Sequence, residues 1–301
     1  MQSENHFVEL PILLEKGITL ALKREDLLHP FISGNKYRKL KYNLEEAKNQ
    51  KEHTLLTFGG AYSNHIAALS YAGREKGFVT IGIIRGEELK EKWQENPTLA
   101  FAHENGMSFK FMSRAAYRKK TDPAFLLELE KEYGSFYLVP EGGTNTLAIK
   151  GCEEILDTAD HDFDTICTCV GTGGTMAGLI NTIEPHQIVM GFSALKGDFL
   201  NAELTKLTSK KNWKLITDYH FGGYGKITEE LVGFMNTFKE TTGIPLDPIY
   251  TGKMLYGLLD MIRNDNFAKG TKILAIHTGG LQGITGMNIK LKKKNLPLLH
   301  I

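Results

Sequence analysis

One lysine of this sequence stands where a chemically active amine is expected. Lys36 follows Ser33 and Asn35, which are good helix-capping residues, and apolar residues recur after it at helical spacing. The positive end of the helix dipole and the nearby cations Arg38 and Lys39 lower the pKa of such a lysine, and burial would lower it further. A partly neutral lysine can act as a nucleophile or form a Schiff base with an aldehyde. The alternative is an ordinary surface lysine in a basic turn.

The glycine-rich loop 171–175 is the second candidate for chemistry. It joins a buried strand, expected at 164–170, to a helix expected from about 176 to 183. Backbone N–H groups at the start of a helix suit a phosphate, and glycines let the anion approach the backbone. The alternative is a tight strand–helix turn without a ligand. The loop consists of Gly171, Thr172, Gly173, Gly174 and Thr175.

Strands that alternate with helices must position these groups. The pattern predicts an α/β protein with a parallel, doubly wound sheet. Residues 1–30 read as an irregular arm and a short strand. Further strands are expected at 53–58, 79–84, 108–112, 136–140, 164–170, 188–192, 213–218 and 272–276. Helices are expected after Asn35 and at 66–76, 97–104, 123–133, 147–156, 176–183, 199–207, 228–242 and 252–263.

Other polar glycine loops stand at the ends of the predicted strands. They occupy 59–65, 141–145, 222–225 and 277–280. In an open parallel sheet, ligands bind beyond the carboxyl ends of the strands. We therefore expect these loops to surround the same ligand as the loop 171–175.

Composition and charge exclude several classes of function. The chain has 301 residues, 42% hydrophobic and 24% charged content, and a net charge of +1, so nucleic acid and anionic membranes are not expected partners. The amino terminus does not resemble a signal peptide, and no apolar run reaches the length of a membrane span. Because the three cysteines suggest no disulfide framework, a cytoplasmic location is expected. The basic segment 290–294 reads as a solvated helix end.

The three cysteines predict neither disulfides nor a metal site. Cys152, Cys167 and Cys169 form no recognisable disulfide framework. Cys167 and Cys169 lie two apart in a predicted strand, and we expect both to point to one side of a buried sheet as small core residues.

The phosphate expected at loop 171–175 fits a small cofactor best. A dinucleotide fingerprint needs an acid about 20 residues further on, at the end of the next strand, and none occurs there before Asp198. A nucleotide-binding lysine is also missing, because Met176 follows Thr175. Pyridoxal phosphate needs a phosphate cradle, a Schiff-base lysine, a donor to its ring oxygen and a partner for its ring nitrogen.

Taken together, the motifs resemble a known family. The chain is similar over about residues 20–285 to the pyridoxal-phosphate-dependent 1-aminocyclopropane-1-carboxylate deaminases and D-cysteine desulfhydrases. The resemblance implies the two-domain tryptophan-synthase-β-like fold, also called fold type II. Residues 1–45 and 145–301 would form the large cofactor-binding domain, and 46–144 a small inserted α/β domain. The matching segments are 33–40, 63–65, 171–175, Tyr224, 247–253 and 277–280.

The resemblance implies how pyridoxal phosphate would be held. Lys36 would form the Schiff base and later move the Cα proton. Asn64 would bond the ring oxygen, and Thr278 would face the ring nitrogen. The backbone amides of the phosphate loop would hold the phosphate, namely those of Gly171, Thr172, Gly173, Gly174 and Thr175.

It also implies how a small amino-acid substrate would be held. Ser63 and His65 would bind its carboxylate beside Asn64, and Ser63 would be near enough for proton transfer. Tyr224 and Tyr250 would lie against the cofactor and substrate, which makes them expected catalytic residues together with Lys36 and Ser63. Turn formation, helix capping and core packing are the alternatives for these side chains. Lys253 is expected to be structural.

One departure from the family pattern bears on the reaction. Deaminases of the cyclopropane amino acid place a glutamate after the second tyrosine, whereas Thr251 stands there in this chain. A carboxylate keeps the ring nitrogen protonated, while a hydroxyl such as that of Thr278 leaves the ring nearly neutral. The weaker electron sink suffices for α,β-elimination. A desulfhydrase-like lyase that converts D-cysteine to pyruvate, ammonia and sulfide is therefore expected.

Three other functions remain open at this point. The first is 1-aminocyclopropane-1-carboxylate deaminase, which yields 2-oxobutyrate and ammonia. The second is an NAD(P)-dependent oxidoreductase that uses loop 171–175. The third is a non-catalytic carrier that keeps the fold and the cofactor. The resemblance implies a homodimer.

Overall fold

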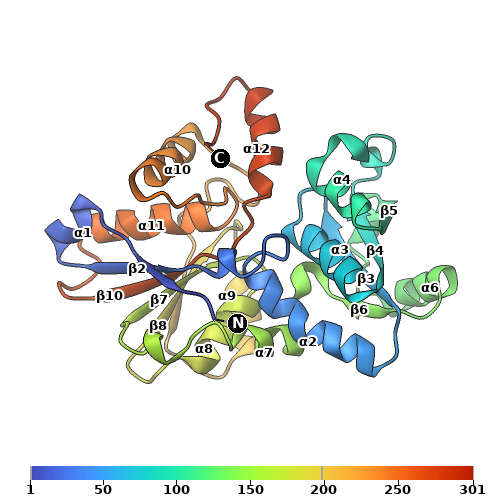
Figure 1. The fold of residues 1–301 in the computed structure, drawn as a ribbon, viewed down its shortest axis with the longest axis horizontal. Coiled ribbons are helices and arrows are strands. Elements are labelled where there is room, and N and C mark those ends of the chain that lie inside the picture. Colours follow the sequence, from blue (N-terminus) through green and yellow to red (C-terminus); the bar gives the residue numbers. More distant parts are fainter. Residues whose placement is uncertain (1, 198, 301) are drawn as a thin grey trace.

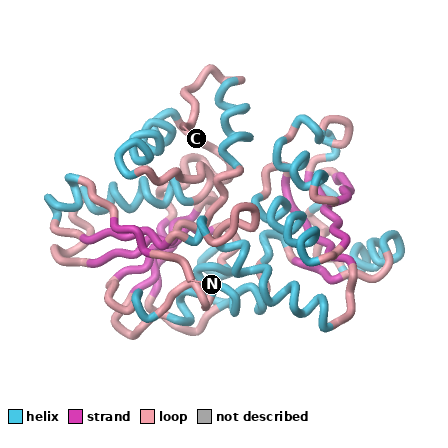
Figure 2. Tube along the Cα trace, in the orientation of Figure 1, coloured by secondary structure: helices cyan, strands magenta, loops and turns pink. Residues whose placement is uncertain are grey.

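The computed structural model describes residues 2–197 and 199–300, and its strands form two sheets (Figures 1 and 2). In the larger sheet every neighbouring pair is parallel except β1 with β2. Its strand order is β1 (Asn5–Phe7), β2 (Thr19–Lys23), β10 (Lys272–Ile276), β7 (Thr165–Val170), β8 (Ile188–Ser193) and β9 (Trp213–Ile216).

The smaller sheet is entirely parallel. Its order is β5 (Met107–Met112), β4 (Val79–Arg85), β3 (Thr54–Gly60) and β6 (Tyr137–Val139). The prediction of parallel sheets with alternating helices is confirmed. The two-domain division at 45/46 and 144/145 stays a prediction.

Helices cover both faces of each sheet, as Figure 1 shows. The larger sheet packs on one face against α1 (Pro11–Lys16), α10 (Glu229–Thr242), α11 (Thr251–Arg263) and α12 (Gly283–Lys292). Its other face packs against α7 (Thr146–Cys152), α8 (Gly174–Thr182) and α9 (Phe199–Leu207). The smaller sheet lies among α2 (Asn35–Asn49), α3 (Asn64–Lys76), α4 (Pro97–Glu104), α5 (Arg114–Tyr117) and α6 (Pro123–Tyr133).

The strand β7 shows why its sequence is almost wholly apolar. All six of its residues are buried, because helices cover both faces of the sheet. Cys167 and Cys169 belong to the core on one face, and Ile166 and Val170 to the core on the other. The alternation confirms that the two cysteines point to the same side.

Helix α2 connects the two sheets. Leu40, Leu44 and Ala47 pack into the core of the smaller sheet. Near its start, the backbone of Arg38 touches α7, where a Cβ built on Gly151 would lie 2.0 Å from the Arg38 carbonyl oxygen. The predicted domain boundary at 45/46 falls inside this helix.

The start of α2 differs from the predicted capping arrangement. Gly34 occupies the N-cap position with φ +64°, and no side chain caps the helix. A Cβ on Gly34 would lie 1.9 Å from the Thr278 carbonyl oxygen, so only glycine allows this close approach. Ser33 instead donates to the Asp26 carbonyl oxygen. The side chain of Asn35 turns toward loop 171–175.

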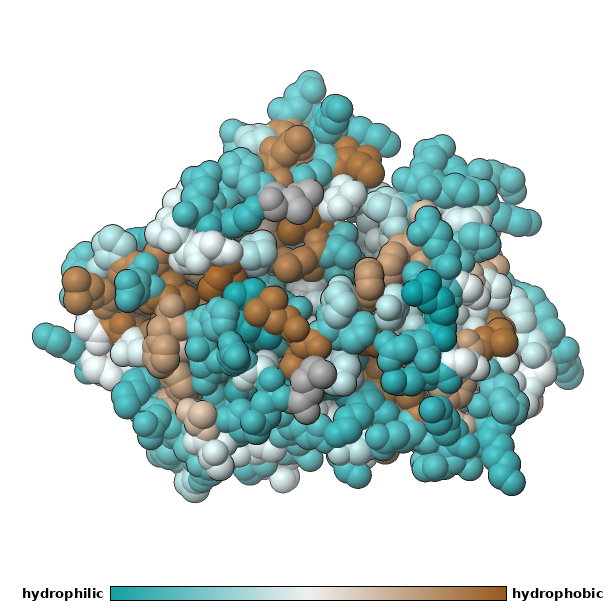
Figure 3. Space-filling view, in the orientation of Figure 1, coloured by the Kyte–Doolittle hydropathy of each residue, from teal (hydrophilic) through white to brown (hydrophobic). Residues whose placement is uncertain are grey.

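Three helices, α1, α5 and α12, were not among the predicted elements. Pro11 begins α1 and Gly17 ends it in a left-handed conformation, inside the arm that was expected to be irregular. Helix α12 contacts α4, which packs beside the smaller sheet. None of the described helices is long and apolar enough to cross a membrane. Hydrophilic side chains dominate the face seen in Figure 3.

Candidate active site

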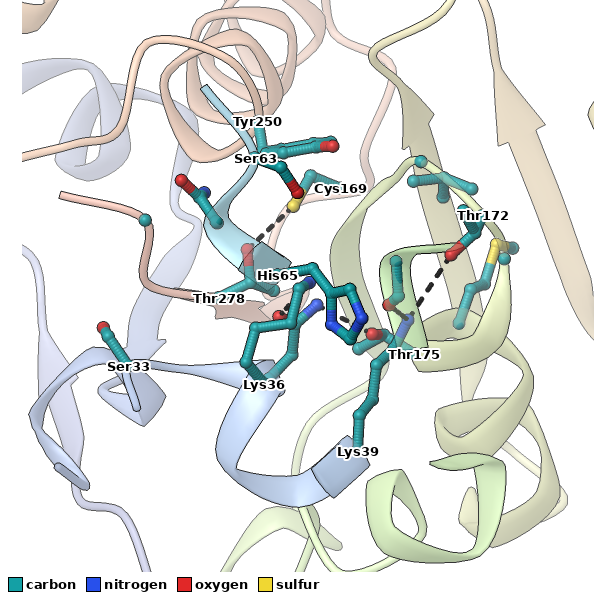
Figure 4. A pocket seen from close by; sticks show the side chains of 18 of the residues that line it. Ser33, Lys36, Lys39, Ser63, His65, Cys169, Thr172, Thr175, Tyr250 and Thr278 are labelled. Atoms are coloured by element: carbon teal, nitrogen blue, oxygen red, sulfur yellow. Dashed lines mark hydrogen bonds between the residues drawn. The ribbon is translucent and has the colours of Figure 1, made fainter. Parts of the chain in front are cut away.

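A pocket lies where the carboxyl ends of β7 and β10 meet the start of α3 (Figure 4). It encloses about 660 Å³ including its opening to solvent. Every residue predicted for the site lines this pocket except Gly174. The predicted lining residues are Lys36, Ser63, Asn64, His65, Gly171, Thr172, Gly173, Thr175, Tyr224, Tyr250 and Thr278.

The amine of Lys36 enters the pocket from the first turn of α2. Its Nζ donates to Asn35 Oδ1 at 3.0 Å. Burial, followed by the charge of Lys39, lowers the pKa of Lys36 to about 7. Arg38 lies away from the pocket in a buried bidentate pair with Glu25, at 2.9 and 2.8 Å. The predicted depression of the pKa therefore arises from burial and Lys39.

Lys39 lies one turn after Lys36 and also lines the pocket. Its Nζ donates to Thr144 Oγ1 at 2.9 Å, to the Gly142 carbonyl oxygen at 3.2 Å and to Thr172 Oγ1 at 3.4 Å. Burial lowers the pKa of this ammonium as well. Its partners are all neutral oxygens, and an anion beside loop 171–175 would supply the missing countercharge.

Loop 171–175 is held against α2 by side-chain contacts. Thr175 Oγ1 accepts from Asn35 Nδ2 at 2.9 Å. Gly173 has φ +84° and precedes the first residue of α8, so the loop turns directly into a helix N-terminus. Gly174 faces Thr144 and Lys39 instead of the pocket, since a Cβ there would lie 2.9 Å from the threonine side chain.

The first turn of α3 forms another side of the pocket. Ser63 is its N-cap and accepts from the Ile66 N–H at 3.3 Å, as the turn-forming alternative required. Asn64 Oδ1 accepts from Gln282 Nε2 at 3.0 Å, which leaves the Asn64 amide hydrogens available to a ligand.

His65 is buried beneath this turn and has a defined tautomer. Thr57 Oγ1 donates its only hydrogen to the Val139 carbonyl oxygen at 2.7 Å, so it accepts from His65 Nε2 at 2.8 Å. Burial, followed by Lys36 and Lys39, lowers the pKa of His65 well below its usual value. The ring is neutral, and its buried Nδ1 has no hydrogen-bond partner among the described residues.

Tyr224 and Tyr250 lie beside the glycine loop 171–175. Their rings meet edge to face, with centroids 6.2 Å apart, and Tyr250 lies within 3.2 Å of a Cβ built on Gly171. Burial, followed by Tyr224 and Asp247, raises the pKa of Tyr250 well above its usual value. Asp247 holds the segment that enters α11 by accepting the Thr251 N–H at 2.7 Å and the Ile249 N–H at 2.9 Å.

Thr278 stands at the end of β10 and contacts a cysteine. Its Oγ1 lies 3.0 Å from Cys169 Sγ, which also lines the pocket. Burial raises the pKa of Cys169 to about 12, so the thiol keeps its hydrogen and can donate it to Thr278. The threonine hydrogen is then free for an acceptor in the pocket. Thr251 is fully buried and does not line the pocket.

The pocket also contains side chains that sequence reasoning did not assign to it, among them Asn35, Lys39 and Cys169. Lys39 could have been found because residues three apart share a helix face. Cys169 could have been found because it ends a parallel strand, where ligands bind. Among the described residues, no group of three or more His, Cys, Asp or Glu side chains is arranged to hold a metal ion.

Comparisons with known proteins agree with this geometry. A "Putative 1-aminocyclopropane-1-carboxylate deaminase" of Pyrococcus furiosus is 34% identical over 292 residues, covering 89% of this chain and 86% of that protein. The "Bifunctional D-cysteine desulfhydrase/1-aminocyclopropane-1-carboxylate deaminase, mitochondrial" of Arabidopsis thaliana is 32% identical over 302 residues, covering 90% and 74%. A solved structure of an ACC deaminase homologue aligns with a TM-score of 0.81 and 30% identity, and the alignment covers 97% of this chain and 94% of that chain.

The family match removes one of the open functions. The sequence pattern of a family described as "Pyridoxal-phosphate dependent enzyme" matches residues 4–279. The NAD(P)-dependent oxidoreductase alternative therefore has no support, and pyridoxal phosphate is the cofactor. The fold is the tryptophan-synthase-β-like fold type II. The chain belongs to the pyridoxal-phosphate-dependent enzymes.

Proposed function

We propose that this enzyme is a lyase that eliminates a leaving group from Cβ of a small D-amino acid, and that it converts D-cysteine to pyruvate, ammonia and sulfide. The observation that carries the proposal is the neutral pair of Thr278 and Cys169. Among the described residues that line the pocket there is no Asp or Glu. A hydroxyl that donates to the ring nitrogen keeps that nitrogen unprotonated, which suits elimination of a good leaving group.

The donor set of the pocket fits pyridoxal phosphate. Bound pyridoxal phosphate supplies an aldehyde that combines with amines and a ring that accepts electrons from Cα. Lys36 is the amine proposed to hold the aldehyde. Lys39, the loop amides and the hydroxyls of Thr172 and Thr175 would hold the phosphate, and the Asn64 amide would donate to the ring oxygen.

The substrate carboxylate would bind at the N-terminus of α3. The Ser63 hydroxyl and the first backbone N–H groups of the helix, at Asn64 and His65, all belong to this turn. The imidazole of His65 has a bare Nδ1 and cannot donate to a carboxylate in this tautomer. We therefore assign the backbone of His65, and not its ring, to carboxylate binding.

Proton transfer would involve Lys36 and the residues close to it. An amine with a pKa of about 7 is partly neutral at pH 7, so it can accept the Cα proton. The Tyr250 hydroxyl is protonated at the same pH and can only donate or orient. Tyr224 is 43% exposed and would cover the outer side of the substrate.

The alternative is 1-aminocyclopropane-1-carboxylate deaminase. Both names occur among the relatives, so relatedness does not choose between the two substrates. The lack of an Asp or Glu side chain among the described residues that line the pocket favours the desulfhydrase. A cytoplasmic location and a homodimer are further proposals.

The test is a substrate comparison with purified holoenzyme. We expect D-cysteine to yield pyruvate and sulfide, and Lys36→Ala to abolish turnover. Release of 2-oxobutyrate from the cyclopropane acid with no product from D-cysteine would instead establish the deaminase. A visible cofactor band without turnover of any D- or L-amino acid would favour the non-catalytic carrier.

A further inference from the structure

A basic groove of about 1850 Å³, including its opening to solvent, lies outside the pocket. It runs between the smaller sheet, the α5 region and the end of α12. One acidic side chain, Glu88, lines it among the described residues. Seven cationic side chains line it: Arg85, Arg114, Arg118, Lys120, Lys226, Lys290 and Lys294.

The groove is continuous with the pocket through a short mouth. Tyr224 lines the pocket, the mouth and the groove, and Arg85 lines the mouth and the groove. The mouth also contains Ser63 and Thr172, which line the pocket, and the carboxylate of Glu141, which Lys120 neutralises in an ion pair of 3.2 Å. Arg85 lies beside the loop before α3, since a Cβ on Gly60 would be 3.5 Å from its guanidinium. A ligand can therefore extend from the pocket past Arg85.

Most of the positive charge in the groove is not neutralised by the protein. Arg114 pairs with Glu88 at 3.0 Å, and Lys120 pairs with Glu141 at 3.2 Å. Among the described residues, no carboxylate forms an ion pair with the remaining cations, which are Arg85, Arg118, Lys226, Lys290 and Lys294. The groove is therefore locally basic, although the net charge of the whole chain is only +1.

Lys290 illustrates the repulsion within this cluster. Its Nζ lies 4.0 Å from the centre of the Tyr62 ring, so the side chain is held over the groove. Burial, followed by Lys294 and Lys226, lowers the pKa of Lys290. The basic segment expected to be only a solvated helix end thus contributes two of its lysines to the groove.

We propose that the groove binds an anionic group at the end of the substrate side chain, so that among small D-amino acids with a leaving group on Cβ the enzyme binds most tightly those that carry a phosphate, sulfate or carboxylate beyond Cβ. This inference rests on the proposed lyase function. The guanidinium of Arg85 is the first cation that such a side chain would meet on its way out of the pocket, and its planar fork suits oxyanions.

The reaction on such a substrate needs water and no other additional reactant. For O-phospho-D-serine, the Cα–H bond breaks and its proton passes to Lys36, and the Cβ–O bond breaks with its electron pair leaving on phosphate. Tautomerisation and addition of one water to the remaining unsaturated amine give pyruvate and ammonia. The cations of the groove would stabilise the departing dianion.

Binding can be tested on the holoenzyme by rapid-mixing absorbance titration with O-phospho-D-serine and D-serine, which measures binding before turnover. We expect the phosphorylated amino acid to bind at least about tenfold more tightly, an effect of the size of one charge-assisted hydrogen bond. Arg85→Gln and Lys290→Gln should each reduce this ratio about tenfold. Lys292→Gln, on the same helix but outside the groove, should leave the ratio unchanged.

Three outcomes overturn the proposal. The first is equal affinity of the holoenzyme for the two amino acids. The second is weaker binding of both amino acids by Arg85→Gln, which would mean that Arg85 binds the α-carboxylate. Binding of inorganic phosphate that does not compete with O-phospho-D-serine would show a separate anion site. A preserved tenfold preference with no turnover of either amino acid or of D-cysteine would refute the lyase function and leave the anion site standing.

Discussion

Helix α2 positions both pocket lysines, and its contact with α7 offers a sharp test of that arrangement. Gly151→Ala places a Cβ 2.0 Å from the Arg38 carbonyl oxygen, whereas Cβ contacts shorter than 3.0 Å essentially do not occur. The two backbones must separate by about 1 Å (3.0 minus 2.0). Because Arg38 lies between Lys36 and Lys39, that shift moves both amines relative to loop 171–175.

The magnitude follows from two opposing effects. Alanine in a helix is favoured over glycine by up to about 1 kcal/mol, whereas overpacking with a backbone shift costs about 1 to 3 kcal/mol, and a contact as short as 2.0 Å belongs at the upper end of that range. We expect a net loss of about 2 kcal/mol in the free energy of unfolding. Gly233→Ala is the matched control, because this glycine lies in α10 with no atom within 4 Å of its added Cβ. It should gain up to about 1 kcal/mol.

Urea unfolding of the cofactor-free protein measures the stability difference, and an absorbance titration with pyridoxal phosphate measures the effect on the pocket. Gly151→Ala should bind the cofactor about tenfold more weakly than Gly233→Ala. Equal unfolding midpoints for the two variants would refute the clash. Normal cofactor affinity in a destabilised Gly151→Ala protein would refute the link between this contact and the pocket lysines.

Four further predictions follow from individual contacts. In cofactor-free protein, the acylation rate of Lys36 should rise with pH and reach half its maximum near pH 7, because the pKa of this lysine is lowered to about 7. Lys41, whose pKa is raised by Glu154, should need a higher pH. Peptide mapping measures both rates, and equal pH profiles would contradict the assignment. Lys39→Met should weaken pyridoxal phosphate binding about tenfold or more, by loss of one charge-assisted contact, while exposed Lys48→Met on the same helix should not. Lys253→Met should lower the free energy of unfolding by about 2 kcal/mol or more, because Lys253 donates to the His220 and Gly223 carbonyl oxygens at 2.9 Å each. A loss near zero would show that water replaces the lysine ammonium as the donor to these oxygens. Thr251→Val should leave the stability unchanged or raise it by about 1 kcal/mol, since the buried hydroxyl has no hydrogen-bond partner among the described residues. A large loss of stability in calorimetric melting would instead show that this hydroxyl makes a hydrogen bond.

Periodicity and loop chemistry predicted most of the fold. The alternation of strands and helices was enough to recognise parallel sheets, because buried strands such as Thr165–Val170 are apolar throughout. Helix α12 was missed because its only strong signal is a lysine-rich end. The capping of α2 was also predicted incorrectly, since the close approach of Gly34 to Thr278 is a tertiary contact that no local pattern contains.

The pocket residues were predicted more completely than their hydrogen bonds. Lys36 and Thr278 could be found from the sequence because they belong to recognisable motifs. The tautomer of His65 could not, since it depends on Thr57 and Val139, which meet it only in the folded protein. The contact between Cys169 Sγ and Thr278 Oγ1 likewise requires the register of β7 with β10.

The shared helix α2 has a consequence for how the molecule melts. Its apolar residues complete the core of one sheet, while its first turn is fixed to the other sheet through Gly34 and Gly151. If either sheet unfolds, helix α2 loses part of its packing, and the other sheet then loses the packing that α2 supplies. We therefore expect heat to disrupt both sheets in one cooperative step, and a ligand bound only near Lys36 to raise the melting temperature of the whole chain.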